Sequence, residues 1–414
     1  PWLILAMAGG FADDGRFNLA VDYGRIAFVY ILFISLAALA SGVLNATGRF
    51  AAAAAAPVLL NIVLITAVLL SSAGCKCTPE ESQEWTGLFL AWGVPIAGIA
   101  QLALVWIAAR RAGVSLLPRF PRMTPDMKRL AVIAGPAMLA GGVMQVNLLV
   151  GRQVASFFDG AIAWLSYADR LYQLPLGVVA IALGVVLLPD LSRRLAAGDE
   201  AGGRDAFNRA SELALALTIP AAVALMVIPV PLVSVLFERG AFDSDDTAAT
   251  ALAVTVYGLG LPAFVLQKAL QPLYFAREDT KRPFHFALVA MVVNAVVAIG
   301  LSVTIGYVAA ALATTLAAWV MVWLLWRGSR SMGDAARFDA RFKSRIWRIV
   351  LASILMGGLL IGAVLAVGPA LGLAGARYAA LAFVVIIGMV GYFIIGHLIG
   401  AFKLSEFKAA VRRG

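Results

Sequence analysis

The sequence has few of the residues from which soluble enzymes build catalytic and metal sites. Its 414 residues include two cysteines, two histidines and 23 acidic residues, and charged side chains make up 14% of the chain. Cys75 and Cys77 have no histidine nearby, which argues against a zinc site, and a disulfide between them would be tight even in an oxidising compartment. Acid–base or metal chemistry would need paired carboxylates or a metal cluster. We therefore expect no catalytic activity, no metal and no cofactor.

Apolar residues, in contrast, dominate the chain. They make up 62% of it, and the mean hydropathy is +0.91, far above the range of soluble globular proteins. The apolar runs are about 20 residues long, which matches the thickness of a bilayer, and they do not alternate with the period of two that a β-barrel requires. The sequence therefore predicts an all-α polytopic membrane protein.

We expect eleven complete spans after a short apolar start. Residues 1–8 are too short to cross a bilayer and are interpreted as the end of a helix that begins upstream. Proline residues interrupt the sixth and seventh spans, which is typical of mobile or cavity-lining segments in a bundle. The predicted spans are Arg25–Asn45, Pro57–Ser72, Gly87–Ala109, Leu130–Val150, Ala161–Leu188, Ala210–Phe237, Ala248–Phe275, Phe284–Thr304, Gly306–Trp326, Ile346–Val367 and Tyr378–Ile399.

The basic residues are distributed unequally between the two sets of alternating loops. Most of the 33 Lys and Arg residues fall in one set, and Arg170 and Lys268 fall within spans. The positive-inside rule makes the first set cytoplasmic. The net charge of +10 is thus a topology signal, and no nucleic-acid partner is expected because there is no compact basic domain outside the membrane. The opposite loops hold only Arg16, Arg25, Lys76, Arg152, Arg239 and Arg377.

A weak internal repeat relates two parts of the chain. Each copy contains a Tyr-Gly pair, then a span that ends in a basic turn, then a second span with an asparagine. The first copy has Tyr23-Gly24 and Asn61, and the second has Tyr257-Gly258 and Asn294. The two copies are offset by six predicted helices, an even number, so they cross the membrane in the same direction. This arrangement predicts two lobes related by a parallel pseudo-two-fold axis.

The stretch Ala161–Arg194 contains the strongest candidate for a binding residue. Arg170 lies well inside its predicted span, where an unpaired charge costs roughly 2.5–3.5 kcal/mol on insertion scales. Helical spacing places Ser166, Tyr167, Arg170, Gln173 and Gly177 on one face. Arg stays protonated and binds phosphate oxygens bidentately, so this face is expected to line a wet cavity that takes an anionic ligand. The alternative is a structural ion pair with Asp159 or Asp169.

Other polar residues within spans are weaker candidates. Lys268 and Gln271 lie one turn apart, close enough to the cytoplasmic end for Lys268 to reach the interface instead. Asn61, Gln145 and Asn147 are also candidate substrate contacts, although single polar residues in spans more often form hydrogen bonds between helices. A sodium site at Asn294 and Thr314 is not supported, since Ala298 supplies no carboxylate one turn further on.

Several segments together resemble the MurJ (MviN) family of lipid II flippases, within the superfamily of multidrug and polysaccharide exporters. The resemblance runs over the whole chain and is most specific at residues 164–194. It implies fourteen helices in two six-helix lobes around a cationic cavity, followed by a helix pair whose groove takes a polyprenyl tail. The segments that carry it are YILFISLAALASGVLNATGRF at 30–50, PVLLN at 57–61, WLSYADRLYQLPLGVVAIALGVVLLPDLSRR at 164–194, LFERGAFDSDDT at 236–247 and YFAREDTKRPF at 274–284.

By this resemblance the first two helices of the family precede the chain. Residues 1–110 are then the remnant of the N-terminal lobe (the end of helix 3 and helices 4–6), 111–127 a cytoplasmic linker, 128–330 the C-terminal lobe (helices 7–12), and 344–414 helices 13–14 with a cytoplasmic tail. Arg170 matches a cavity arginine of the family, whereas Gln173 stands where some relatives carry an acid.

The function that the resemblance implies is transport. The intact protein is expected to move lipid II, an undecaprenyl-diphosphate-linked peptidoglycan precursor, across the bacterial inner membrane by alternating access, with lipid II and membrane lipids as its partners. The alternative is a multidrug or lipid-linked glycan exporter of the same superfamily. An exporter of cationic drugs predicts acidic residues in the middle of the membrane, and apart from Asp169 these are scarce.

Overall fold

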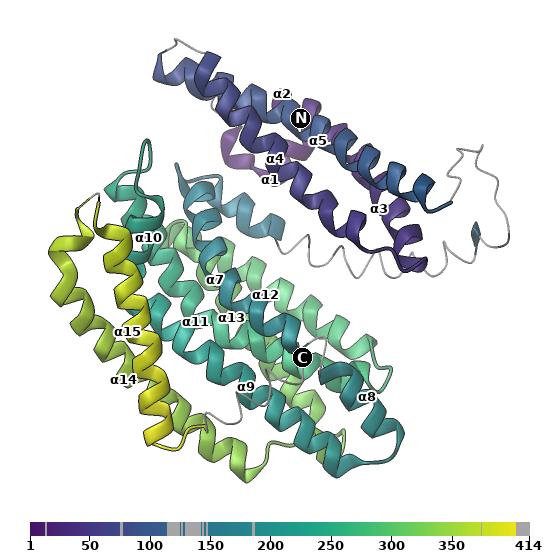
Figure 1. Ribbon diagram of the computed structural model, residues 1–414, viewed down its shortest axis with the longest axis vertical. Helices are drawn as coiled ribbons and strands as arrows, with labels where there is room; N and C mark the ends of the chain where they lie inside the picture. The colour runs from purple at the N-terminus through teal and green to yellow at the C-terminus, as the bar shows by residue number, and fades with distance from the viewer. Residues whose placement is uncertain are drawn as a thin grey trace. The chain divides into compact units, whose positions relative to one another are not determined.

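The computed structural model describes residues 1–12, 15–74, 78–113, 125, 127–128, 142, 145, 148–183, 187–373 and 375–402. The chain divides into two compact units, Pro1–Ile133 (unit 1) and Ala134–Gly414 (unit 2), shown as ribbons in Figure 1. The regular structure in the described residues is helical, which confirms the predicted all-α fold class. Cys75, Cys77 and Asn147 lie outside the described residues.

The described residues contain nine helices that are long and apolar enough to span a membrane, and nine of the predicted spans correspond to them. Of the other two predicted spans, Leu130–Val150 falls largely outside the described residues and Ala161–Leu188 contains the helix α7. The nine are Arg16–Ala46, Ala51–Gly74, Glu81–Arg111, Glu200–Val227, Ser244–Phe275, Lys281–Ile305, Val308–Ser329, Asp334–Leu371 and Arg377–Leu398.

In unit 1 the long helix α5 packs against both α3 and α4, which contact each other little. Thr78 begins α5 with a capping box to Glu81, which satisfies two of the free N–H groups at the helix start. The buried amide of Gln101 accepts a hydrogen bond from the Tyr30 hydroxyl and donates one to the carbonyl of Ala56, so it joins all three helices. The helices are α1 (Trp2–Met7), α2 (Arg16–Phe28), α3 (Tyr30–Ala46), α4 (Ala51–Gly74) and α5 (Pro79–Arg111).

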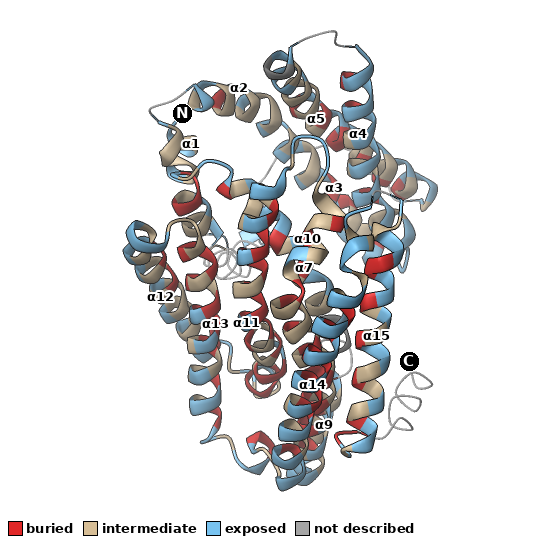
Figure 2. Cartoon of the chain, turned by 90° about the vertical axis from the view of Figure 1, so that its left-hand side faces the viewer, coloured by how far each residue is buried: buried red, intermediate tan, exposed pale blue. Residues whose placement is uncertain are grey.

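Unit 2 is built around α9, α11 and α13. Buried residues follow these helices in Figure 2, and the core includes the fully buried Phe207, Leu261, Leu273 and Leu325. The helices are α7 (Ala161–Ala182), α8 (Leu188–Ala196), α9 (Glu200–Val227), α10 (Pro229–Phe237), α11 (Ser244–Phe275), α12 (Lys281–Ile305), α13 (Val308–Ser329), α14 (Ala340–Leu371) and α15 (Arg377–Leu398).

The two units share one packing pattern. In unit 2, α13 packs against both α11 and α12, which barely contact each other, as α5 does with α3 and α4 in unit 1. The Thr315 hydroxyl donates to the carbonyl of Val256 and ties α13 to α11, as the Tyr30 to Gln101 bond ties α3 to α5. This similarity supports the repeat predicted from Tyr23-Gly24 and Tyr257-Gly258.

Helices α14 and α15 form a pair on one side of α9 (Figure 1). Gly388 of α15 faces Leu360 of α14 so closely that an added Cβ would lie 2.6 Å from a Leu360 methyl carbon, and such small residues let membrane helices approach. The Tyr392 hydroxyl donates to the carbonyl of Ala216 at 2.6 Å. The pair is thus fixed to α9 by both packing and hydrogen bonding.

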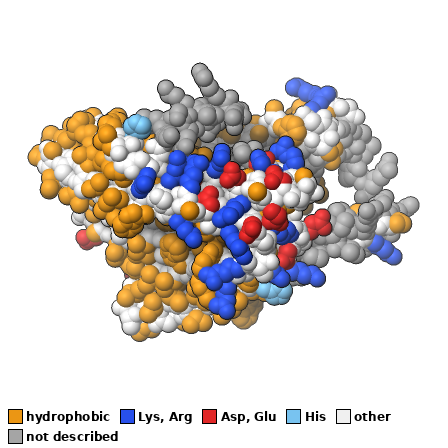
Figure 3. All heavy atoms as spheres, turned by 90° about the horizontal axis from the view of Figure 1, so that it is seen from below, with side chains coloured by type: hydrophobic (Ala, Val, Ile, Leu, Met, Phe, Trp, Pro, Cys, Tyr) orange, Lys and Arg blue, Asp and Glu red, His pale blue; other side chains and the backbone are white. Residues whose placement is uncertain are grey.

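The end of unit 2 where α8, α9 and α14 begin carries many charged side chains, seen as blue and red groups in Figure 3. Buried Glu212 of α9 forms ion pairs with Arg341 and Arg345 of α14. Asn208 donates to the carbonyl of Arg337 and accepts from the N–H of Asp339. The start of α9 therefore holds the connection between α13 and α14.

The predicted span boundaries can be compared with the structure at three places. Within Ala161–Leu188, α7 runs to Ala182, Leu183 and Leu187 have π-helical geometry and α8 starts at Leu188, while residues 184–186 lie outside the described residues. Ala210–Phe237 divides at Ile228, as the predicted interruption by Pro229 requires, because Pro229 has no N–H to continue α9. Finally, Arg152 was expected in a loop, but residues 148–155 are helical.

Candidate substrate-binding site

The helix α7 has one packed side and one exposed side. Its packed side includes Ala168 and Leu171, which belong to the core of unit 2. The opposite side carries the predicted polar face, where the side chains of Ser166, Tyr167, Arg170 and Gln173 are exposed, together with the half-buried Gly177. The helical spacing read from the sequence therefore gives a face that unit 2 itself does not cover.

Arg170 has no ion-pair or hydrogen-bond partner among the described residues. Its sequence neighbour Asp169 points elsewhere and accepts a hydrogen bond from the side-chain amide of Gln173. Consecutive residues on a helix project about 100° apart, which explains why Asp169 does not pair with Arg170. The guanidinium stays available to a ligand.

A polar pocket of about 140 Å³ lies beside Asp169 within unit 2. Of the predicted substrate contacts that the structure describes, none lines it. Its lining residues are Leu148, Gly151, Arg152, Ala155, Ile162, Leu165, Ser166, Asp169, Tyr172, Tyr257, Ala310 and Thr314.

Arg152 is the lining residue that sequence reasoning missed. It lies eight positions before Gly160, whose positive φ of 75° makes the turn, and Asp169 lies nine positions after it. Residues 148–155 are helical and α7 begins at Ala161, so Arg152 lies three residues before the end of its helical segment and Asp169 lies eight residues into α7. The fold brings both side chains to one pocket. Spacing along the sequence does not predict this pairing, because the turn between the two helical segments sets it.

Aromatic side chains hold α7 in place. The Trp164 indole donates to a carboxylate oxygen of Asp246 at 2.6 Å, and its ring packs edge-on against Tyr307 at 5.0 Å between centroids. Deeper in the helix, the Tyr172 ring lies 4.8 Å from Tyr257. These contacts to α11 and to the start of α13 fix the rotation of α7, and with it the direction of the polar face.

The other predicted contacts do not gather around Arg170. Lys268 is exposed on α11, nearer the opposite end of the bundle, and Gln271 one turn on is half-buried. Asn61 of α4 and Gln145 are exposed. Of the polar residues expected to join helices, buried Asn294 donates to the Thr314 hydroxyl at 3.4 Å. Arg170 and Gln173 thus share the exposed face of α7, and the roles of all the predicted residues stay predictions.

Comparison with known proteins places this geometry in a family. The family model described as lipid II flippase MurJ matches residues 1–387. A probable lipid II flippase MurJ of Rhizobium tropici is 40% identical over 416 residues, covering 100% of this chain and 76% of that protein. The chain belongs to the MurJ family. A second relative with the same name, from Rhizobium meliloti, is 41% identical over 412 residues, covering 99% of this chain and 76% of its own length.

A solved structure agrees with this assignment at the level of the fold. The chain is similar to a lipid II flippase MurJ in an inward closed conformation, with a TM-score of 0.76 and 24% identity over 96% of this chain and 78% of the other. This confirms the fold that the resemblance implied. The fourteen-helix count and the domain boundaries drawn from the MurJ pattern stay predictions.

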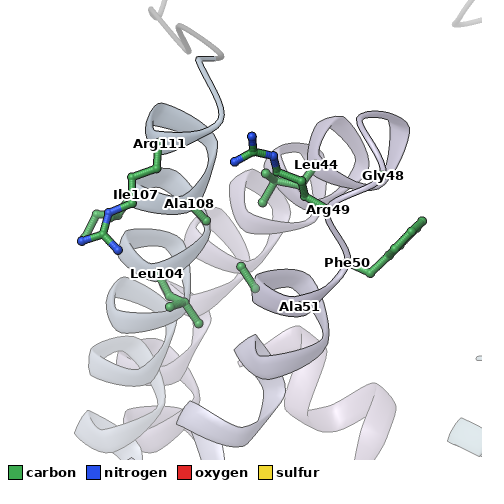
Figure 4. A pocket seen from close by; sticks show the side chains of 10 residues that line it. Leu44, Gly48, Arg49, Phe50, Ala51, Leu104, Ile107, Ala108 and Arg111 are labelled. Atoms are coloured by element: carbon green, nitrogen blue, oxygen red, sulfur yellow. The ribbon is translucent and has the colours of Figure 1, made fainter.

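Unit 1 of this MurJ-family chain contains a cleft of about 540 Å³ where α3 and α5 end and α4 begins. Figure 4 shows Arg49 at the turn after α3 with its guanidinium directed toward α5, which carries Arg111. The walls between them are mostly apolar, with Leu44, Leu104 and Ile107. Both arginines belong to the loops that we predict to be cytoplasmic.

Unit 2 contains a second, apolar cavity of about 300 Å³ between α9, α14 and α15. Its walls include Pro220 of α9, Leu360 of α14 and Met389 of α15. It lies on the helix pair whose groove, by the family resemblance, takes a polyprenyl tail.

Proposed function

We propose that this chain is the translocating part of a lipid II flippase of the bacterial inner membrane. The observation that carries the proposal is Arg170, a permanent cation on the exposed face of α7 with no partner among the described residues, in a chain that matches the MurJ family over residues 1–387. A charge in a membrane helix is retained when it has a functional partner. We infer that the partner is the diphosphate of lipid II.

The chemistry of the ligand fits the two kinds of surface on unit 2. A diphosphate presents oxygens that the planar guanidinium of Arg170 binds in pairs, and Gln173 on the same exposed face of α7 carries no negative charge of its own. A polyprenyl tail needs an apolar path, and the cavity between α9, α14 and α15 offers one. In this proposal the polar head crosses beside α7 while the tail stays among apolar helices.

Translocation then needs alternating access to the two sides of the membrane. We propose that the lobes rock about the site so that it opens first to the cytoplasmic and then to the outer side. The protein breaks and forms no covalent bond in this cycle, so we infer a transporter and not an enzyme. The asymmetry of basic loops sets the direction of insertion.

The test is a flipping assay with the intact protein in proteoliposomes, comparing Arg170→Ala and Arg170→Lys with the natural protein. Loss of a charged hydrogen bond costs about 1.5–3 kcal/mol, so Arg170→Ala should slow lipid II transfer roughly 10- to 100-fold. Arg170→Lys keeps the charge but loses the planar guanidinium that binds two oxygens at once. Its transfer rate should therefore lie between those of Arg170→Ala and the natural protein. Arg209→Gln, an exposed residue paired with Asp205, is the matched control and should transport normally. Normal transport by both Arg170 variants would refute the role of Arg170.

A further inference from the structure

Two arginines meet at the end of unit 2 that is remote from the charged face of α8, α9 and α14. Arg239 follows α10, and Arg377 begins α15. Each donates a hydrogen bond to the same phenol oxygen, that of Tyr378, at 3.4 Å from Arg239 and 3.2 Å from Arg377. Two like charges therefore share one neutral acceptor.

Backbone carbonyls, and not acids, hold these guanidiniums in place. Arg239 also donates to the carbonyl of Leu236 at 2.9 Å, and Arg377 to the carbonyl of Glu238 at 3.2 Å. The nearby carboxylate of Glu238 accepts instead from the Thr247 hydroxyl of α11 at 2.9 Å. Across the described part of the chain, neither guanidinium has an acidic group within ion-pair distance.

One donor at this place has no acceptor. The Nε of Arg377 is buried without a hydrogen-bond partner, although buried polar groups are normally paired. The positions of both guanidiniums are fixed by their carbonyl and phenol contacts, so little side-chain freedom is left to lose when a ligand binds. Two cations held in fixed orientations suit a phosphate group, which offers several acceptor oxygens.

The surroundings indicate that this phosphate belongs to a lipid. Tyr378 is 48% exposed beside Arg377, as is typical of a residue at the membrane interface. The apolar cavity between α9, α14 and α15 includes Gly388, eleven residues further along α15 and therefore about 16 Å deeper. A lipid with its phosphate at the arginines would direct its chains toward this cavity.

We propose that Arg239, Arg377 and Tyr378 form a binding site for the phosphate of a membrane lipid at the outer end of α10 and α15. Both a phospholipid headgroup and a polyprenyl diphosphate carry this chemistry. The site does not involve Arg170, and its test measures binding and not flipping. A failed flipping assay with Arg170 variants therefore leaves the test of this site intact.

The test uses native mass spectrometry of the intact protein with phosphatidylglycerol and, separately, a polyprenyl diphosphate. The double variant Arg239→Gln/Arg377→Gln should lose roughly tenfold or more in apparent affinity, whereas the control Arg209→Gln should bind as the natural protein does. A loss with both lipids supports a general phosphate site, and a loss with the diphosphate alone supports a site for the transported lipid.

A second readout separates binding from folding. If the arginines serve only to hold α15 on α10, the double variant melts at a lower temperature but binds both lipids normally, and this result overturns the proposal. Lysine at both positions keeps the charges and should retain most of the binding. Equal loss of binding in the lysine and glutamine variants, together with a lower melting temperature in both, also overturns it.

Discussion

At the scale of single residues, the charges of unit 2 differ in what faces them. Glu212 is only 7% exposed, and Arg341 and Arg345 of another helix neutralise it. Arg170 is exposed on its helix and has no such partner among the residues that the structure describes. The first arrangement is a structural cluster, because it is complete without a ligand. Arg170 instead remains available to a ligand. Both charges lie in predicted spans, so the sequence position of a charge does not by itself reveal its role.

The Glu212 cluster gives a stability prediction. Glu212→Ala removes the buried acid that pairs with both arginines, and breaking a mostly buried ion cluster in this way should cost about 3 kcal/mol. For a domain of this size that lowers the melting temperature in detergent by roughly 5–10 °C. The measurement is thermal unfolding of the purified protein.

The matched control for this change is Asp205→Asn. It removes the acid from the exposed pair of Asp205 with Arg209, and exposed pairs contribute little. Its melting temperature should stay close to that of the natural protein. A Glu212→Ala protein as stable as this control would show that the cluster contributes nothing to the fold.

At the scale of helices, prolines show what the sequence can and cannot give. Pro220 lies inside α9 and Pro262 inside α11, and both helices continue through them. Pro229 instead starts α10, because Ile228 before it has a φ of −122° and is no longer helical. The sequence predicted interruptions at all of these prolines. Which proline divides a helix depends on packing by neighbouring helices, and that information is not local.

The contact between α9 and α11 gives a prediction at the same scale. A Cβ added at Gly258 would lie 3.2 Å from the backbone carbonyl of Ala222 and 3.1 Å from Met226, so Gly258→Leu must push the helices apart. Overpacking of this kind costs about 1–3 kcal/mol. Gly300→Leu on α12 meets nothing within 4 Å and is the control. The melting temperature should fall for Gly258→Leu alone, and equal melting of both variants would contradict close packing here.

At the scale of the whole molecule, the order of the helices could be predicted from the sequence, since length and hydropathy determine where a chain crosses lipid. Family membership was also visible in residues 164–194. The pocket at Asp169 could not be predicted from the sequence. Arg152 lines it because the helix before α7 continues past the predicted end of its span and the chain then turns at Gly160. Its partner groups come from α11 and α13, which are distant in sequence. A surface formed by segments that are distant in sequence can be predicted only when the packing of the helices is known as well as the hydropathy pattern.

Orientation in the membrane gives a prediction for the whole chain. In a protein with Cys75 and Cys77 replaced by serine, a single cysteine at exposed Ala241 should react in intact cells with a membrane-impermeant maleimide. A single cysteine at exposed Ser331 should react only after the cells are broken, because the positive-inside rule predicts that the basic loops face the cytoplasm. Labelling with the opposite pattern would reverse the topology, and with it the direction that we propose for transport.

The shared packing of α3, α4 and α5 with α11, α12 and α13 also bears on ancestry. In each set of three helices, the third helix packs against the other two. Duplication of a shorter gene is the simplest explanation for this shared arrangement. Because the predicted offset between the copies is an even number of helices, the product of that gene had no need to insert in both directions. Fusion could then join two identical neighbours and let each copy diverge: buried Asn294 in one, exposed Asn61 in the other.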